Sequence, residues 1–426
     1  MSIVKRALTG ALLGLLLTAL AMGSALAHGK AIQFSTQSEK ARQLIDDITN
    51  GIESFQTGPA LAAMAQELVE ADPEWGFGYM VLSQFQPTAQ GQESMKKAQE
   101  LSAHLNEAEK QYMEGVIAIR SQDVPKALGI FQALAKEYPG ERRAHMLVGQ
   151  LEMALGNIEK SQEALETSFK LSSSTPRVYA FLGNCHLVQG RYSKAGKLYD
   201  KGIAMADPDT FPFGLYFGQI FSQVHQRNVD TALAKVDLAL EKYIETGGAQ
   251  NFPPVFFYNL RGRINLENGR LEAAMKDYEK GLKVVEGAES LPDQQKQIWT
   301  GRYQHGRART LAKMGKHEQA WAIAEEMKKQ IDENGDVGAQ FVPVYHYLAG
   351  YIKLEAGEYE KAIEHLVNAT PTDPFHRILL ARAYLKAGQK DKAKEVYEEV
   401  AGVNQVSMER SLAYPEAKEM LEKLGG

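Results

Sequence analysis

The sequence contains one cysteine, Cys185, among its 426 residues. A single thiol cannot form a disulfide within the chain, and it also excludes a cysteine-rich metal site. His186 follows this cysteine, but adjacent residues of a helix point about 100° apart, so the two are not expected to form a catalytic pair. A phosphate-binding loop and the motifs HExxH, CxxC and GxSxG are missing as well. We therefore expect a protein that is not an enzyme.

A strong excess of one charge is also missing. Lys and Arg together number 48 and Asp and Glu together number 53, which gives a formal net charge of −5 at pH 7. Without a broad basic surface, nucleic acid is not an expected partner. The 10 histidines include no pair four residues apart, so no metal ion or other cofactor is expected. The apolar share of 44% is ordinary for a soluble protein, although 426 residues are many for one compact core.

A long apolar run occurs only at the N-terminus. Two basic residues precede a run from Ala7 to Met22, and small residues follow at Ala25 and Ala27. This pattern is typical of a secretory signal peptide over residues 1–27, with cleavage after Ala27. The alternative is a membrane anchor, but the run contains Thr and Gly and is barely long enough to span a bilayer. We expect a mature chain that does not span a membrane and is periplasmic or secreted.

Residues 28–40 form a polar lead-in to the rest of the chain. Cleavage would leave His28 at the new N-terminus, where its amine and its ring could chelate copper. Such a site needs further histidines close by, and the sequence offers no paired partner. We therefore expect a bare polar tail here.

A unit of 34 residues recurs three times between Ala108 and about Asp207. The copies share a small residue at the eighth place, a turn-forming residue at the fifteenth, a small residue at the twentieth and a large apolar residue at the twenty-fourth. These places hold Gly115, Gly149 and Gly183; Gln122, Gly156 and Gly190; Ala127, Ser161 and Ala195; and Phe131, Leu165 and Tyr199. A period of this length is typical of a repeat of two helices.

Each of these places has a physical role in a pair of helices. A small eighth residue lets the first helix approach the second, and glycine at the fifteenth place ends the first helix in a left-handed turn. The small twentieth residue lies where the helices cross, and the large apolar residue four places later fills the space beside the crossing. On these residues the pattern resembles the tetratricopeptide repeat. That resemblance implies an all-α fold, an α-α superhelix that forms a right-handed solenoid of about ten helix pairs.

The rest of the chain follows the same pattern less strictly. We expect repeats over residues 41–245 as an N-terminal arm and over 255–405 as a C-terminal arm, with a capping helix over 406–426. Residues 246–254, rich in Gly and Pro, either separate two arms or form a plain long loop. Loops at about 286–296 and 331–342, together with longer second helices, would account for the spacings that exceed 34 residues.

The resemblance also implies a groove, because in such repeats the first helix of each unit lines the inner surface. Mapping the inner places onto this sequence selects a set rich in Arg and Tyr, the residue types that anchor interfaces and bind carboxylates. The set is Tyr112, Arg143, Gln150, Arg177, Asn184, Asn259, Arg263, Arg309, Tyr347, Tyr351 and Arg382. The family's peptide clamp pairs such an Asn with a Lys, but Ala180 occupies the Lys place before Asn184, so that clamp is not transferred.

Three functions remain open from the sequence. The first is an exported scaffold or adaptor that binds a protein or peptide, one carrying acidic groups, through its concave face during cell-envelope assembly. The second is an accessory module of polysaccharide or peptidoglycan machinery, in which inner tyrosines stack on sugars. The third is an enzyme or metal carrier without a recognised motif. Because repeats of this kind are general adaptors, the fold alone does not choose among them.

Overall fold

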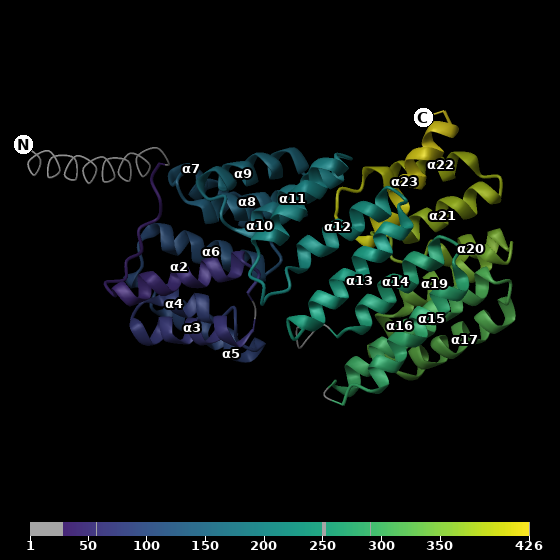
Figure 1. The fold of residues 1–426 in the computed structure, drawn as a ribbon, viewed down its shortest axis with the longest axis horizontal. Helices are drawn as coiled ribbons and strands as arrows, with labels where there is room; N and C mark the ends of the chain where they lie inside the picture. The colour runs from purple at the N-terminus through teal and green to yellow at the C-terminus, as the bar shows by residue number, and fades with distance from the viewer. Residues whose placement is uncertain (1–28, 57, 249–252, 290, 426) are drawn as a thin grey trace, which may run out of the picture. The chain divides into compact units, whose positions relative to one another are not determined.

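The computed structural model describes residues 29–56, 58–248, 253–289 and 291–425. Within these ranges every regular element is a helix, and the helices follow one another along the chain as successive pairs (Figure 1). The all-α fold class predicted from the sequence, an α-α superhelix of helix pairs, is thereby confirmed. The predicted signal peptide, its cleavage after Ala27 and the chelating role weighed for His28 lie outside the described residues.

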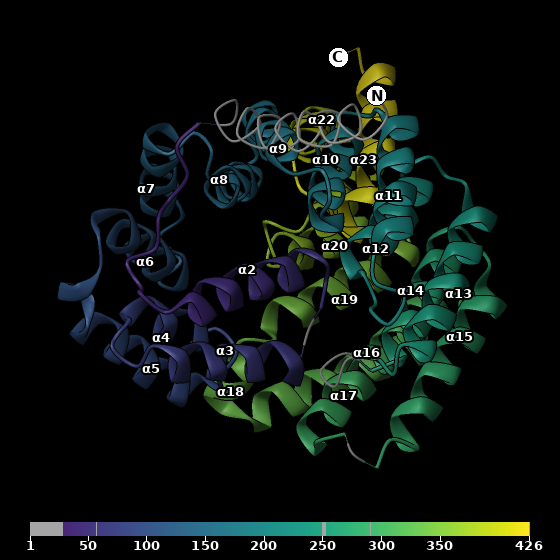
Figure 2. The same cartoon turned by 60° about the vertical axis from the view of Figure 1, so that its left-hand side comes forward.

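The chain divides into two compact units, residues 1–185 and 186–426. The helices of unit 1 are α2 (Glu39–Glu53), α3 (Pro59–Ala71), α4 (Gly76–Leu82), α5 (Thr88–Glu100), the short 3₁₀ helix η1 (Ser102–His104), α6 (Glu107–Arg120), α7 (Val124–Glu137), α8 (Arg142–Ala154) and α9 (Ile158–Leu171). The division falls inside α10 (Pro176–Val188). In unit 1, α2 lies beside α3 and α3 beside α4 (Figure 2).

Unit 2 continues the same order of helix pairs. Its helices are α11 (Tyr192–Met205), α12 (Phe213–His225), α13 (Val229–Glu245), α14 (Val255–Glu267), α15 (Leu271–Glu286), α16 (Asp293–Lys313), α17 (His317–Glu333), α18 (Gly335–Ala339), α19 (Val342–Glu355), α20 (Tyr359–Leu366), α21 (Pro374–Lys386), α22 (Lys390–Gly402) and α23 (Met408–Lys423). Since α13 and α14 pack on each other, the segment 246–254 joins two helices inside unit 2.

Two details differ from the sequence-based expectation. The loop expected at about 286–296 is shorter, because α16 already begins at Asp293 and runs for 21 residues. The loop expected at about 331–342 contains the short helix α18. The extra length of this part of the chain lies partly in longer second helices, as expected, since α15 has 16 residues and α17 has 17. The rest lies in the long first helix α16.

The close approach of paired helices rests on the small eighth place and the large twenty-fourth place. A Cβ atom on Gly115 in α6 would lie 2.6 Å from the ring of Phe131 in α7, which is too close for a real contact. The same pair of places brings Gly149 of α8 against Leu165 of α9, where a Cβ would lie 2.5 Å from Leu165. Phe131 and Leu165 are both 0% exposed. The crossing of each pair is therefore filled by one large side chain set against bare backbone.

The fifteenth place is left-handed even where the residue is not glycine. Gly156 and Gly190 have φ angles of 78° and 73°, and Gln122 in the first copy has a φ of 59°. Residues with a Cβ atom adopt this conformation at a cost that glycine does not have. We therefore expect Gln122→Gly to raise the free energy of unfolding of unit 1 by about 0.5–1 kcal/mol.

Denaturant unfolding of the variant against the original chain measures this change. Gln111→Gly, inside helix α6, is the matched control and should lower stability by about 1 kcal/mol, because glycine there only adds chain entropy to the unfolded state. A Gln122→Gly chain that is destabilised as much as the control would contradict the account of this turn.

Candidate functional site

A cavity of about 360 Å³ opens on the inner side of unit 1. Its walls come mainly from the first helices of successive pairs, α2, α4, α6, α8 and the start of α10. The lining is mostly apolar and includes Ile45, Ile48, Ile52, Phe77, Met80, Val81, Val116, Ile119, Met146 and Leu147. A concave, largely apolar site with a few polar groups is the usual form of a ligand-binding pocket.

Four of the sequence-predicted residues meet in this cavity. Tyr112, Arg143, Gln150 and Arg177 all line it, although they come from three different helices. They converge because first helices of successive repeats stack with the same face inward. Asn184, further along α10, is not among the lining residues. The predicted groove therefore has a physical counterpart in unit 1.

Helix α2 closes the cavity on one side. Its C-terminal end reaches α8 and α10, where Arg142 forms an ion pair with Glu53 and its Nη2 atom donates to Asn50 Oδ1 at 2.9 Å. Arg177 Nη1 also donates to the carbonyl of Ile52, at 3.4 Å. The Glu53 side chain is only 6% exposed. These polar contacts hold α2 across the inner face.

The segment before α2 supplies another wall, which the sequence interpretation missed. Residues 29–38 have no regular secondary structure, but they are not a free tail, because Ile32 and Phe34 line the cavity. Two hydrogen bonds hold this segment to the start of α6. Ser35 N donates to Glu109 Oε1 at 2.8 Å, and Asn106 Nδ2 donates to the Gln33 carbonyl at 2.7 Å. The signal that was overlooked is the alternation of apolar residues at Ile32 and Phe34 within the polar lead-in.

The acidic residues of the cavity are already paired. Glu53 binds Arg142, and Glu141 accepts from Arg143 Nη2 at 2.9 Å. Burial alone would lower the pKa of Arg143, but the hydrogen bond and the charge of Glu141 hold it above its ordinary value. Glu109 caps α6 and accepts from the Trp75 indole N–H at 2.9 Å. The carboxylates that line the cavity therefore have little capacity left for an added cation.

Two cavity arginines lack an ion pair among the described residues. Arg177 has the Ile52 carbonyl as its hydrogen-bond partner, and Arg120 Nη2 donates to the Ser83 carbonyl at 2.8 Å. Burial lowers the pKa of both guanidinium groups from their ordinary value. Because neither guanidinium has a carboxylate partner among the described residues, an incoming carboxylate would stabilise both charges.

Tyr112 combines an aromatic wall with a hydroxyl group. Its ring packs edge-on against Phe77 and Phe131, with ring centroids 5.5 Å and 5.3 Å away. Burial raises the pKa of the Tyr112 phenol to about 12, so the hydroxyl stays protonated and can donate a hydrogen bond. Because both ring contacts are internal, this tyrosine shapes the cavity more than it offers a free ring face.

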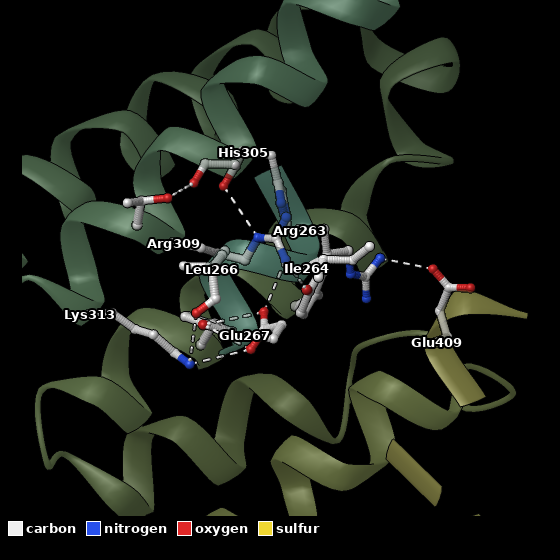
Figure 3. A network of polar contacts seen from close by, with 12 residues as sticks. Arg263, Ile264, Leu266, Glu267, His305, Arg309, Lys313 and Glu409 are labelled. Atoms are coloured by element: carbon white, nitrogen blue, oxygen red, sulfur yellow. Dashed lines mark hydrogen bonds and ion pairs between the residues drawn. The ribbon is translucent and has the colours of Figure 1, made fainter. Parts of the chain in front are cut away.

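The predicted inner residues of unit 2 have a different environment. Arg309 is 5% exposed, donates to Tyr347 Oη at 2.9 Å and pairs with Glu267 at 3.5 Å. Figure 3 shows Glu267 between Arg309 and Lys313, with Arg263 turned toward Glu409. Tyr347 is 6% exposed and Tyr351 0%. In this conformation Arg309, Tyr347 and Tyr351 are buried against one another and are not accessible to a partner.

The remaining inner residues of unit 2 are also occupied by the chain itself. Arg263 Nη1 donates to Glu409 Oε1 at 2.8 Å, and Arg382 Nε donates to Glu416 Oε1 at 2.8 Å. Both carboxylates belong to α23, which packs on α12, α21 and α22. Asn259 donates to the Val255 carbonyl of its own helix. The sequence predicted inner arginines that bind carboxylates. For Arg263 and Arg382 of unit 2, the chain's own last helix supplies these carboxylates.

Cys185 has the environment of a core residue. It is 0% exposed, and its Sγ atom lies 3.5 Å from Ser161 Oγ. Burial raises the pKa of the thiol to about 11. A protonated, inaccessible thiol is a poor nucleophile, so this contact gives no support to catalysis at Cys185.

Two histidines of unit 2 are held neutral. Burial, together with Arg410, lowers the pKa of His225 to about 3. Burial, together with Arg263 and Arg309, lowers the pKa of His376 to about 3. Their hydrogen-bonding and stacking partners include Tyr192 and Tyr347, both uncharged when protonated.

These shifts predict that unit 2 loses stability in acid. Below about pH 6.5 the unfolded chain binds protons at both histidines while the folded chain does not, so unfolding becomes more favourable as the pH falls toward 3. The slope is at most about 1.4 kcal/mol per pH unit for each histidine. Denaturant unfolding between pH 4.5 and 7.5 measures it.

His376→Gln should reduce this pH dependence, because it removes one of the histidines whose pKa the fold lowers. The exposed His104 in unit 1 provides the matched substitution, and His104→Gln should leave the slope unchanged. An equal slope in all three chains would show that the buried histidines do not titrate as described.

Comparison with known proteins places the chain in a family. Models of the tetratricopeptide repeat match residues 112–161, 149–209, 257–284 and 353–410. These ranges cover strictly repeated copies as well as looser ones in unit 2. No curated protein matches the chain.

Several solved structures are similar to the chain at low sequence identity. PilW, described as a widely conserved type IV pilus biogenesis factor, is 17% identical over 56% of this chain and 99% of its own, with a TM-score of 0.42. The human IFIT1 dimer with m7Gppp-AAAA is 14% identical over 85% of this chain and 94% of its own, with a TM-score of 0.45. PilF of Pseudomonas aeruginosa is 15% identical over 49% of this chain and 91% of its own, with a TM-score of 0.32.

The repeat pattern, the paired helices and the family matches agree with one another. Together they show that this chain is a tetratricopeptide repeat protein.

Proposed function

We propose that this protein is a non-enzymatic scaffold that binds a protein or peptide in the inner cavity of unit 1. The observation that carries the proposal is the convergence of Tyr112, Arg143, Gln150 and Arg177 on one cavity built by successive repeats. Tetratricopeptide repeats generally serve protein interaction, and Arg and Tyr are common anchors of interfaces. The inner face of unit 2 is filled by its own side chains and α23, so unit 1 is the better binding surface.

The chemistry of the proposed ligand follows from the apolar wall of the cavity and from the arginines that lack an ion pair. Its apolar wall would receive an aliphatic side chain, and a volume of about 360 Å³ suits one or two such groups. Arg177 and Arg120 form no ion pair within the described chain, whereas the lining acids Glu53 and Glu109 already have an ion-pair or hydrogen-bond partner. A peptide with Asp or Glu near Leu or Ile supplies both complements. Acidic peptide segments are therefore the partner class that we propose.

The proposal also includes export to the periplasm or beyond, with a role in cell-envelope assembly. Its support is the N-terminal pattern of basic residues, an apolar run and small residues at Ala25 and Ala27. None of the described helices is long and apolar enough to cross a membrane. N-terminal sequencing of the protein from its native source tests this part, because cleavage after Ala27 would give a chain that starts at His28.

The glycan alternative finds less support. Sugars stack on open aromatic faces, but Tyr347 and Tyr351 are buried and Tyr112 packs on two other rings. The protein and peptide hypothesis therefore takes precedence over stacking on polysaccharide.

A displayed library of random peptides provides the probe for the cavity. Peptides selected on the full chain should be enriched in an acidic residue next to Leu or Ile. Arg177→Glu should weaken their binding at least about tenfold, because it replaces a charge-assisted contact with a repulsion. Fluorescence anisotropy of a labelled peptide measures the change.

Lys126→Glu is the matched control, since it makes the same change of charge at an exposed position on α7 outside the cavity. It should leave binding within about twofold. Equal losses in both variants, or selected peptides without acidic residues, would contradict the role of Arg177.

A further inference from the structure

Two histidines that are far apart in the sequence meet on the surface of unit 2. His346 lies on α19 and His365 on α20, and their Nδ1 atoms are 3.0 Å apart. Their ring centroids are 5.3 Å apart at an angle of 44°. Both side chains are partly exposed, so solvent can reach the pair.

The fold holds this pair in place. A Cβ on Gly350, one turn after His346, would lie 2.5 Å from Leu366, the neighbour of His365. The crossing of α19 and α20 is therefore as close here as in the other repeats, and Leu366 is 3% exposed. Two imidazoles anchored on a rigid crossing are arranged before any ligand arrives, which reduces the entropy cost of binding.

The pair is not a general feature of the repeat. His346 and His365 occupy the fourth and twenty-third places of their unit. In the unit that begins at Arg142, the same places hold His145 and Ala164. The packing of the repeat therefore does not require two histidines at these places. The contact between His346 and His365 is specific to this unit.

From this geometry we propose that His346 and His365 form a binding site for a divalent transition-metal ion, with Cu(II) as the best match. Imidazole nitrogen is a favoured ligand of Cu, Ni and Zn ions. With metal–nitrogen bonds of about 2.0 Å, nitrogens 3.0 Å apart subtend an angle of about 97° at the metal. That angle is close to adjacent positions of a square-planar ion, whereas tetrahedral Zn(II) prefers about 109°.

The chemical state of the rings suits a metal. Burial lowers the pKa of both histidines, so the rings are neutral near pH 7 and their lone pairs are available. One Nδ1 must carry the hydrogen of the present contact, and a bound ion would take the place of that proton. The described residues contain no cluster of three or more His, Cys, Asp or Glu side chains that could hold a metal, so water or a partner group would complete the coordination.

The charges around the pair come from several elements. The positive charges of Lys328 and Lys353 contribute to lowering the pKa of the histidines and would repel a cation. However, Lys328 is paired with Asp332 at 2.5 Å and Lys353 with Glu358 at 2.9 Å. Glu364 on α20 has a favourable negative charge next to His365. The lysine charges are thus largely compensated, and the local field does not exclude a divalent ion.

Trp321 provides a reporter for the site. Its ring centroid lies 6.2 Å from that of His365, and Tyr345 packs on both histidines at 5.4 and 5.8 Å. A bound paramagnetic ion at the pair would quench the fluorescence of Trp321. The other two tryptophans have other ring partners: Trp75 packs on Phe34, and Trp299 packs on Phe256. Quenching of Trp321 therefore distinguishes an ion bound at this pair from an ion bound elsewhere on the chain.

The test uses the full chain without an affinity tag, stripped with a chelator and titrated with Cu(II), Ni(II) and Zn(II). We expect saturable quenching at one Cu(II) per chain, and an electron paramagnetic resonance spectrum with two nitrogen ligands. His346→Gln and His365→Gln should each weaken binding at least about tenfold. These variants keep a hydrogen-bonding side chain at a partly exposed position, and thermal unfolding in chelator checks that they fold.

The matched control is His145→Gln, which alters the same repeat place in a unit without a second histidine, and it should leave the quenching unchanged. Trp321→Phe should remove the quenching but not the two-nitrogen spectrum. The proposal fails if quenching in the original chain is absent, or if it survives in the His346→Gln, His365→Gln double variant. Tighter binding of Zn(II) than Cu(II) would overturn the assignment of the preferred ion.

Discussion

The structure depends on the contact between a glycine of one helix and a large side chain of the next. At Gly115 and Gly149 the backbone of the first helix touches Phe131 and Leu165 directly, because no Cβ keeps the helices apart. Each such crossing buries a large apolar group completely and fixes the angle between the paired helices. Repeating it along the chain turns the same face of each first helix inward, and these faces together form an inner surface.

What happens at that inner surface distinguishes the two units. In unit 1 the inner face retains a cavity whose acids are paired and whose Arg177 and Arg120 lack an ion pair among the described residues. In unit 2 the arginines have carboxylate partners inside the chain: Arg309 with Glu267, and Arg263 with Glu409 of α23. Since a buried charge is costly unless it is paired, these internal pairs account for the filling of the inner face of unit 2. The same repeat thus yields an open site in one unit and a filled interior in the other.

Much of this could be predicted from the sequence, because the repeat is a local pattern. The period of 34 residues, the left-handed turn at Gly156 and the inward position of Arg177 follow from one helix pair and its neighbours. The burial of Tyr351 could not be predicted, because it depends on Glu267, a residue 84 positions away. The same holds for His346 and His365, which are 19 positions apart and meet only through the crossing of α19 and α20. The segment at Ile32 and Phe34 was missed because its partners at the start of α6, Asn106 and Glu109, are brought to it only by the folded repeats.

Hydrogen–deuterium exchange with and without a bound acidic peptide tests the central claim most directly, since it reports on both inner faces in one experiment. If the cavity of unit 1 is the binding site, the peptide slows exchange in α2, α6 and α8 and leaves α14, α16 and α19 unchanged. Slower exchange confined to α14, α16 and α19 would contradict this account, because it would show that the filled interior of unit 2 opens to receive the partner.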